Sequence, residues 1–156
     1  MSLRTRRSMV SMLDENEICS LLSSFFSIDC IIKSSKNWFN WDENLEIKMV
    51  YVSQCKPSSF SKGNWYYEFF HTFSSKSMEK ITENSCKVIL IDYATKRYAI
   101  LDTDDINWVY ENSSRVRKKG GAVTDFVIRG TDSEYYLEPS LAGTRLYRTI
   151  EVRGFQ

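Results

Sequence analysis

The sequence predicts an α+β fold in which a bent, mainly antiparallel sheet is covered by short helices. Three observations support this prediction. The chain has 156 residues and a mass of 18.3 kDa, which is enough for one domain with a core of its own. Short runs rich in β-branched and aromatic residues follow one another through short polar links, as in antiparallel sheets. Three further segments have the capping residues and apolar spacing of short helices.

The predicted elements follow the order α-β-β-β-α-β-β-α-β-β within a single domain, residues 1–156. Residues 1–12 show no periodicity and are expected to form a loose N-terminal tail. The first helix is predicted to start at Asp14, because acidic residues there and in the next turn suit the positive end of a helix. Its apolar residues recur on one face, at Ile18, Leu21, Leu22, Phe25 and Phe26.

Three strands are predicted after this helix, at residues 27–33, 44–53 and 64–73. Residues 34–43 are expected to form a polar, aromatic hairpin tip between the first two strands. Residues 54–63, which include three serines and a proline, are predicted to form a loop before the third.

The second half of the chain alternates short helices and hairpins. A helix capped by Ser74 or Ser75 is expected to reach Glu83, and another to start at a cap of Thr103 or Asp104. Strands are predicted at residues 86–93, 97–101, 122–129 and 133–138, with a basic loop at residues 115–121. Residues 144–152 fit a strand or a helix equally well.

Composition excludes several classes of protein. The formal net charge is +1, with an excess of cations in residues 115–156, where eight basic residues face five acidic ones. This distribution permits a surface for a polyanion without requiring one. The sequence has no glycine-rich phosphate loop, Walker motif, dinucleotide fingerprint or G-x-S-x-G motif.

Cysteine and histidine usage predicts neither a metal site nor disulfides. The four cysteines are scattered, with no C-x-x-C pair, and His71 is the single histidine. Neither a secretory signal nor an apolar run of about 20 residues is found. We therefore expect a reduced, cytoplasmic protein that does not enter a membrane. His71 is expected to be structural, because no nucleophile or acid lies at a recognisable spacing from it.

Two basic loops are the candidate phosphate contacts. Residues 115–119 contain four cations, followed by Gly120-Gly121, and the serine-rich loop contains two lysines. Such clusters are typical of sequence-independent contacts to a nucleic-acid backbone, although charged runs are more often simply solvated. The candidate residues are Lys56, Lys62, Arg115, Arg117, Lys118 and Lys119.

The aromatic hairpin tip is a candidate base contact. Trp38, Phe39 and Trp41 stand beside polar residues, and exposed aromatic rings stack on unpaired bases. The favoured alternative is that these rings fold back over the sheet as core.

A possible metal-dependent nuclease site is formed by Asp29, Glu46 and Lys48. Glu46 and Lys48 alternate on a strand and share one face, and an aspartate on a neighbouring strand would complete a Mg²⁺ site. The pattern resembles the D…(E/D)-x-K signature of restriction-endonuclease-like nucleases, but the three residues fall one strand too early. An exposed strand face with solvated charges is the favoured alternative.

A broader resemblance covers about two-thirds of the chain, from Lys48 to about Val152. It rests on Asn64-Trp65-Tyr66-Tyr67, Val88-Ile89-Leu90, Tyr98-Ala99-Ile100-Leu101, Asp105-Ile106-Asn107-Trp108, Asp125-Phe126-Val127-Ile128 and Tyr135-Tyr136-Leu137. These segments resemble a DNA-recognition and nuclease-associated α+β domain of prokaryotic restriction-type proteins. Asp102 stands where that pattern has a proline. The resemblance implies a DNA-recognition role, and it assigns no catalytic residue.

The leading hypothesis is a small DNA-binding module of a prokaryotic defence system or mobile element, with no cofactor. One alternative is a Mg²⁺-dependent nuclease; the other is a protein-interaction or small-ligand domain without a nucleic-acid role. The sequence leaves open whether the chain is an enzyme, which DNA it takes and its oligomeric state.

Overall fold

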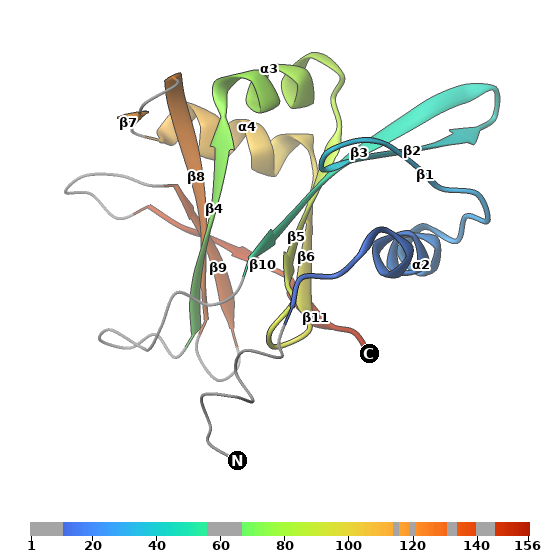
Figure 1. Cartoon of the computed structure of the whole chain (residues 1–156). Helices are drawn as coiled ribbons and strands as arrows, with labels where there is room; N and C mark the ends of the chain where they lie inside the picture. Colours follow the sequence, from blue (N-terminus) through green and yellow to red (C-terminus); the bar gives the residue numbers. More distant parts are fainter. Residues whose placement is uncertain (1–10, 56–66, 114–115, 119–120, 131–133, 140–145) are drawn as a thin grey trace.

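The structure, a computed structural model, describes residues 11–55, 67–113, 116–118, 121–130, 134–139 and 146–156. Its strands form two sheets (Figure 1). The six-stranded sheet has the order β1-β2-β3-β5-β6-β11. Its strands are β1 (Ile32–Ser35), β2 (Trp38–Glu43), β3 (Glu46–Cys55), β5 (Lys87–Asp92), β6 (Arg97–Leu101) and β11 (Arg153–Gly154).

The second sheet has five strands and is antiparallel throughout. β8 pairs with β4 and β9, β10 extends the sheet beyond β9, and β7 also pairs with β8. The strands are β4 (Tyr67–Ser74), β7 (Val116–Lys118), β8 (Gly121–Gly130), β9 (Tyr135–Pro139) and β10 (Arg148–Ile150).

Three helices are fixed by side-chain caps. They are α2 (Glu15–Phe26), α3 (Ser75–Glu83) and α4 (Thr103–Asn112). Asp14 and Asp102 each form a capping box with the residue three positions on, and Ser74 accepts the N–H of Ser77. Among the described residues, no helix is long and apolar enough to cross a membrane.

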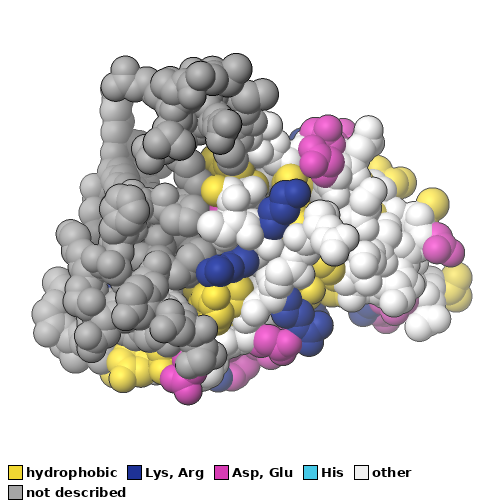
Figure 2. All heavy atoms as spheres, turned by 90° about the horizontal axis from the view of Figure 1, so that it is seen from below, with side chains coloured by type: hydrophobic (Ala, Val, Ile, Leu, Met, Phe, Trp, Pro, Cys, Tyr) yellow, Lys and Arg dark blue, Asp and Glu magenta, His cyan; other side chains and the backbone are white. Residues whose placement is uncertain are grey.

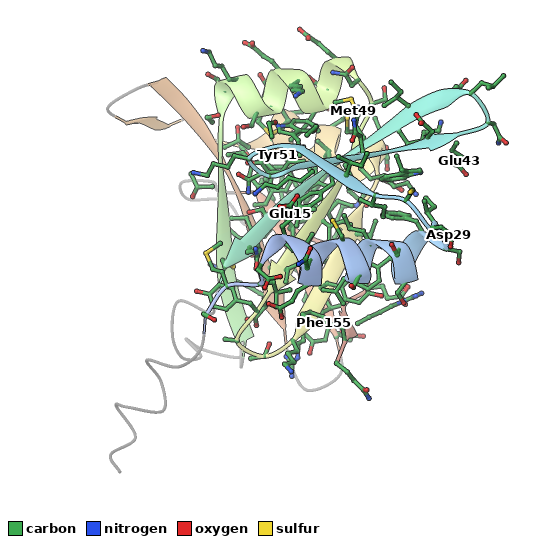
Figure 3. All side chains as sticks on the ribbon, turned by 45° about the vertical axis from the view of Figure 1, so that its right-hand side comes forward. Glu15, Asp29, Glu43, Met49, Tyr51 and Phe155 are labelled. Carbon is green, nitrogen blue, oxygen red and sulfur yellow. The ribbon has the colours of Figure 1, made fainter. Side chains whose placement is uncertain are left out.

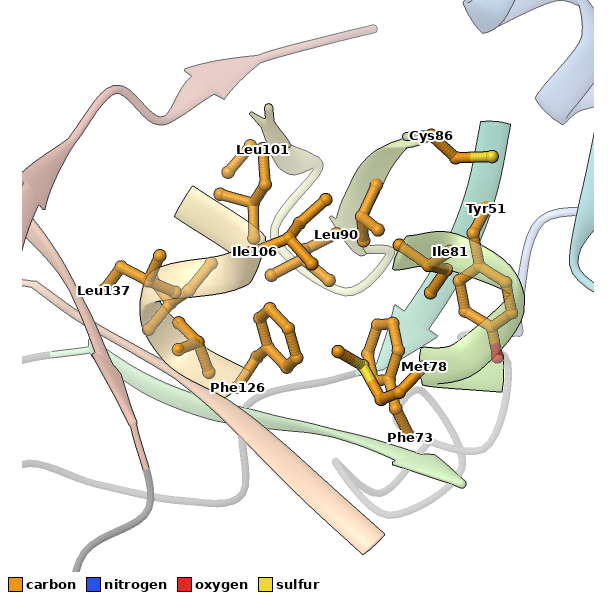
Figure 4. Close-up of a cluster of buried hydrophobic side chains, with 14 of the residues drawn as sticks. Tyr51, Phe73, Met78, Ile81, Cys86, Leu90, Leu101, Ile106, Phe126 and Leu137 are labelled. Atoms are coloured by element: carbon orange, nitrogen blue, oxygen red, sulfur yellow. The ribbon is translucent and has the colours of Figure 1, made fainter. Parts of the chain in front are cut away.

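The main core lies between the two sheets and beneath α3 and α4 (Figures 1 and 4). Phe73 of β4 and Phe126 of β8 pack with their ring centroids 4.7 Å apart, and Tyr51 of β3 meets Phe73 at 5.0 Å. Met78 and Ile81 of α3 and Ile106 and Val109 of α4 are fully buried in the same cluster. Residues from both sheets thus share one interior.

A second core lies on the other face of the six-stranded sheet, under α2. Ile18 and Leu22 of the helix are buried against Val50, Val52, Ile89 and Ile91. Phe25 stacks on Tyr98 of β6 with 3.9 Å between ring centroids. The apolar stripe predicted for this helix therefore faces the sheet, as its spacing requires.

The predicted α+β class and the mainly antiparallel pairing are confirmed. The strands divide between two sheets, and one pairing, β3 with β5, is parallel. This arises because β4 leaves to the second sheet before α3 returns the chain to β5. The right-hand end of Figure 1 holds the β2–β3 hairpin and α2, and β7 lies at the opposite end.

Three local predictions are wrong. Residues 28–31 form the exit from α2 rather than a strand, because Ser27 ends the helix in the left-handed conformation and the chain first pairs at Ile32. The predicted tip at residues 34–43 contains the full strand β2, which pairs with β3 from Trp38 to Glu43. Part of the predicted basic loop is strand β7.

Candidate functional site

A buried histidine lies at the junction of the two sheets: His71 of β4 is 1% exposed. Its ring lies between two side chains of β3, in the other sheet. Nδ1 is 2.7 Å from Ser53 Oγ, and Nε2 is 3.2 Å from Cys55 Sγ. Ser53 and Cys55 are two residues apart on a strand and therefore share a face. The imidazole thus ties the two sheets together.

The electrostatics of this cluster hold every member neutral. Burial lowers the pKa of His71 from 6.5 to about 3. Burial, and then the charge of Asp92, raises the pKa of the Cys55 thiol. Moving a proton from the thiol to the ring would create two desolvated charges, which is the reverse of an activated cysteine. The arrangement therefore serves packing and hydrogen bonding rather than nucleophilic catalysis.

Asp92 lies opposite Cys55 in the β3–β5 pairing and is fully buried. Its carboxylate accepts the backbone N–H groups of Ala94 and Thr95 at 2.9 and 3.1 Å, and also the hydroxyl of Thr95. These bonds organise the turn between β5 and β6. The Asp92 carboxylate next to Cys55 therefore stabilises this turn.

Sequence reasoning missed the link between His71 and its two partners. The partners lie 16 and 18 residues away along the chain, on a strand of the other sheet. The available signal was the S-x-C alternation at the end of a predicted strand. This pattern identifies the two partners of the histidine only when the strand that faces His71 is known.

The three candidate nuclease residues do not occupy neighbouring strands. Asp29 lies exposed in the exit from α2 (Figure 3), whereas Glu46 and Lys48 lie on β3. Lys48 Nζ bonds Glu46 Oε2 at 3.1 Å, and both side chains are largely exposed. Among the described residues, no group of three or more His, Cys, Asp or Glu side chains is placed to hold a metal ion.

The two candidate base-stacking tryptophans are buried. Trp38 is 6% exposed, packs edge-on against Tyr51 and lies under Lys80 Nζ at 4.2 Å. Trp41 is 9% exposed and stacks on Phe26 of α2 with 5.1 Å between ring centroids. Their contact with bases, predicted as one of two possibilities, is corrected: both rings belong to the core, because β2 lies inside the sheet rather than at a tip.

The candidate phosphate contacts are only partly described. Lys56, Lys62, Arg115 and Lys119 lie outside the described residues. Arg117 and Lys118 lie on β7, opposite Ala122 and Gly121 of β8. The structure therefore places two of the predicted cations on a short β-hairpin rather than in an open loop.

No protein-family model, curated protein or solved structure matches this chain. On the face shown in Figure 2, the described basic, acidic and apolar side chains are interspersed. Among the described residues, two predicted phosphate contacts, Arg117 and Lys118, lie together on the hairpin of β7 and β8.

Proposed function

We propose that the protein binds nucleic acid through the hairpin formed by β7 and the start of β8. The observation that carries this proposal is the pairing of Val116, Arg117 and Lys118 with Val123, Ala122 and Gly121. In that register, two of the four cations in residues 115–119 lie on one strand of a two-stranded ribbon.

A two-stranded β-ribbon has the width of the major groove of duplex DNA. Cations at its end would contact phosphates, which supply most of the affinity of sequence-independent binding. β7 also lies at the far end of the molecule from α2 (Figure 1), so this helix does not block the approach of a duplex to the ribbon.

The nuclease alternative has less support. Glu46 and Lys48 satisfy each other at 3.1 Å, and Asp29 lies off the strands. We therefore propose a binding module rather than an enzyme, with duplex DNA as its partner and the phosphate backbone as what it recognises.

The test is fluorescence anisotropy with a labelled duplex and the matching single strand, at low and at moderate salt. The double variant Arg117→Glu/Lys118→Glu should weaken duplex binding at least about tenfold. It should also lower the salt slope by about two, since each lost phosphate contact removes roughly 0.9.

The matched control is Lys33→Glu/Lys36→Glu, which makes the same charge change at exposed positions on and beside β1. Equal losses in the two double variants would reduce the effect to net charge and reject the hairpin. Absence of binding to either strand form at low salt would reject the function. Cleavage with Mg²⁺ that Lys48→Ala abolishes would support the nuclease instead.

A further inference from the structure

A groove of about 360 Å³ opens beside the C-terminal end of α2. Its apolar wall consists of Phe26, Ile28, Trp41 and Met49, and its polar lining consists of Glu43, Lys48, Ser85 and Lys87. Glu43 and Met49 can be followed on the β2–β3 hairpin in Figure 3. The volume falls in the range of small-molecule sites, about 300–1,000 Å³.

The groove exists because the helix is shorter than the strands that it covers. α2 ends at Phe26, where Ser27 adopts the left-handed conformation, while β2 and β3 continue to their turn after Glu43. Trp41 and Lys48 face each other in the β2–β3 register, on the face of the sheet that packs against α2. Beyond Phe26 that face is left open.

Charges in the groove are separated along the strands. Glu43 lies opposite Glu46, and Lys87 lies opposite Val50. Four residues of strand separate these two positions, roughly 13 Å at about 3.3 Å per residue. That separation exceeds the screening length of about 8 Å at physiological ionic strength. Electrostatic repulsion between the acidic pair and an anion bound beside Lys87 is therefore weak.

The Lys87 end of the groove is the cationic end. Lys87 makes no ion pair with any residue that the structure describes, whereas Lys48 is paired with Glu46. Ser85, which precedes β5, brings a hydroxyl to the same end. The carbonyl end of α2 disfavours an anion near Phe26, so that wall suits the apolar part of a ligand.

Trp41 adds an unused donor. Its indole Nε1 is shielded from solvent and has no hydrogen-bond partner among the described residues. Buried donors without partners are rare in folded proteins. The ring of Trp41 lines the groove, so its indole N–H resonance reports on a ligand that contacts the ring.

We infer that this groove is a binding site for a small aromatic carboxylate. Its ring lies against Phe26, Ile28 and Trp41, and its carboxylate binds Lys87 and Ser85. This site is separate from the β7–β8 hairpin, and its existence does not depend on nucleic-acid binding.

The test uses naphthalene-2-carboxylate and follows the indole N–H resonances of the uniformly ¹⁵N-labelled protein. The Trp41 resonance, assigned with Trp41→Phe, should shift saturably with a dissociation constant of about 1 mM or tighter. Lys87→Gln should weaken binding roughly tenfold, the size expected for one charge-assisted hydrogen bond. Lys76→Gln, at an exposed position on α3, should leave it unchanged.

Naphthalene-2-carboxamide has the same ring without the charge and should bind roughly tenfold more weakly. Equal binding of the two compounds, or equal effects of the two lysine variants, would overturn the assignment. A Trp41 resonance that does not move would overturn it as well. If Trp41→Phe fails to fold, Lys87→Gln and the carboxamide still decide, followed through whichever indole resonance shifts.

Discussion

Ser53 Oγ and His71 Nδ1 lie 2.7 Å apart although the two residues belong to different sheets. With Cys55 on the other ring nitrogen, the imidazole is enclosed and neutral. A neutral imidazole donates through one nitrogen and accepts through the other, so both contacts can be satisfied at once. Protonation would turn both nitrogens into donors and place a charge where water cannot reach it.

The protein should therefore become less stable as the pH falls through the range in which the histidine of the unfolded chain titrates. The pKa of His71 is about 3 in the folded protein and 6.5 ordinarily, so the unfolded state binds more protons below pH 6.5. The free energy of unfolding should drop by about 1.6 kcal/mol between pH 6.5 and 5 from this group.

Urea unfolding at a series of pH values measures this effect, and His71→Gln is the control. The variant should be less stable at pH 7 but should lose the slope between pH 5 and 6.5, because its side chain does not titrate. An unchanged slope in His71→Gln would assign the pH dependence to other groups.

The pair Arg129–Glu138 should contribute strongly because it is shielded. Arg129 Nη1 lies 3.1 and 3.0 Å from the two carboxylate oxygens, and the side chains are 15% and 11% exposed. Arg129→Met leaves a shielded carboxylate without this partner and should cost about 3 kcal/mol by urea unfolding. Arg129→Met/Glu138→Leu should recover most of that loss.

The exposed pair Lys48–Glu46 provides the contrast. Lys48→Gln should change the free energy of unfolding by less than about 0.5 kcal/mol, since exposed ion pairs contribute little. If Arg129→Met costs no more than Lys48→Gln, shielding does not distinguish the two pairs.

The cap of α2 should matter more than the charge beside it. Asp14 accepts the N–H of Glu17 at 2.8 Å, and Glu17 returns a bond to the N–H of Asp14 at 3.2 Å. Asp14→Ala should lower stability by about 1 kcal/mol. Glu15→Ala, at the first helical position, should cost clearly less, and a larger loss there would assign the effect to the helix dipole instead.

Gly130 is required by the ring of Tyr135. A methyl group at position 130 would meet Cδ1 and Cε1 of that ring at 2.6 and 2.7 Å. Gly130→Ala should therefore cost about 1–3 kcal/mol through overpacking. A double-mutant cycle with Tyr135→Ala should show that most of the cost disappears once the ring is gone; a fully additive pair would contradict the clash.

Local signals account for most of the elements. Asp14 and Ser74 fix the starts of their helices through bonds within the next three residues, and the strands at residues 87–92 and 97–101 lie within one residue of their predicted bounds. Asp102, one residue before the predicted range of caps, begins α4 in the same way. Such signals act over one turn of chain, so the sequence is sufficient to find them.

Errors arose where the outcome depended on a distant partner. In the predicted strand at residues 44–53, alternation puts Leu45 and Ile47 on one face with Met49 and Tyr51, yet Leu45 and Ile47 are 106% and 67% exposed. Alternation correctly gives the shared face, but α3 and the second sheet cover only its inner part. Trp38 and Trp41 are buried for the converse reason, since Tyr51 and Phe26 meet them from elsewhere.

Periodicity and contacts within a few residues are sufficient to predict the helices, the caps of α2 and α3, most strands and the α+β class. Tertiary structure alone decided that the strands form two sheets, that His71 meets Ser53 and Cys55, and that α2 stops short of the β2–β3 hairpin. These features depend on which faces meet across 16 or more residues of chain. No local sequence pattern specifies such a contact, because the burial of each residue depends on a partner that is distant along the chain.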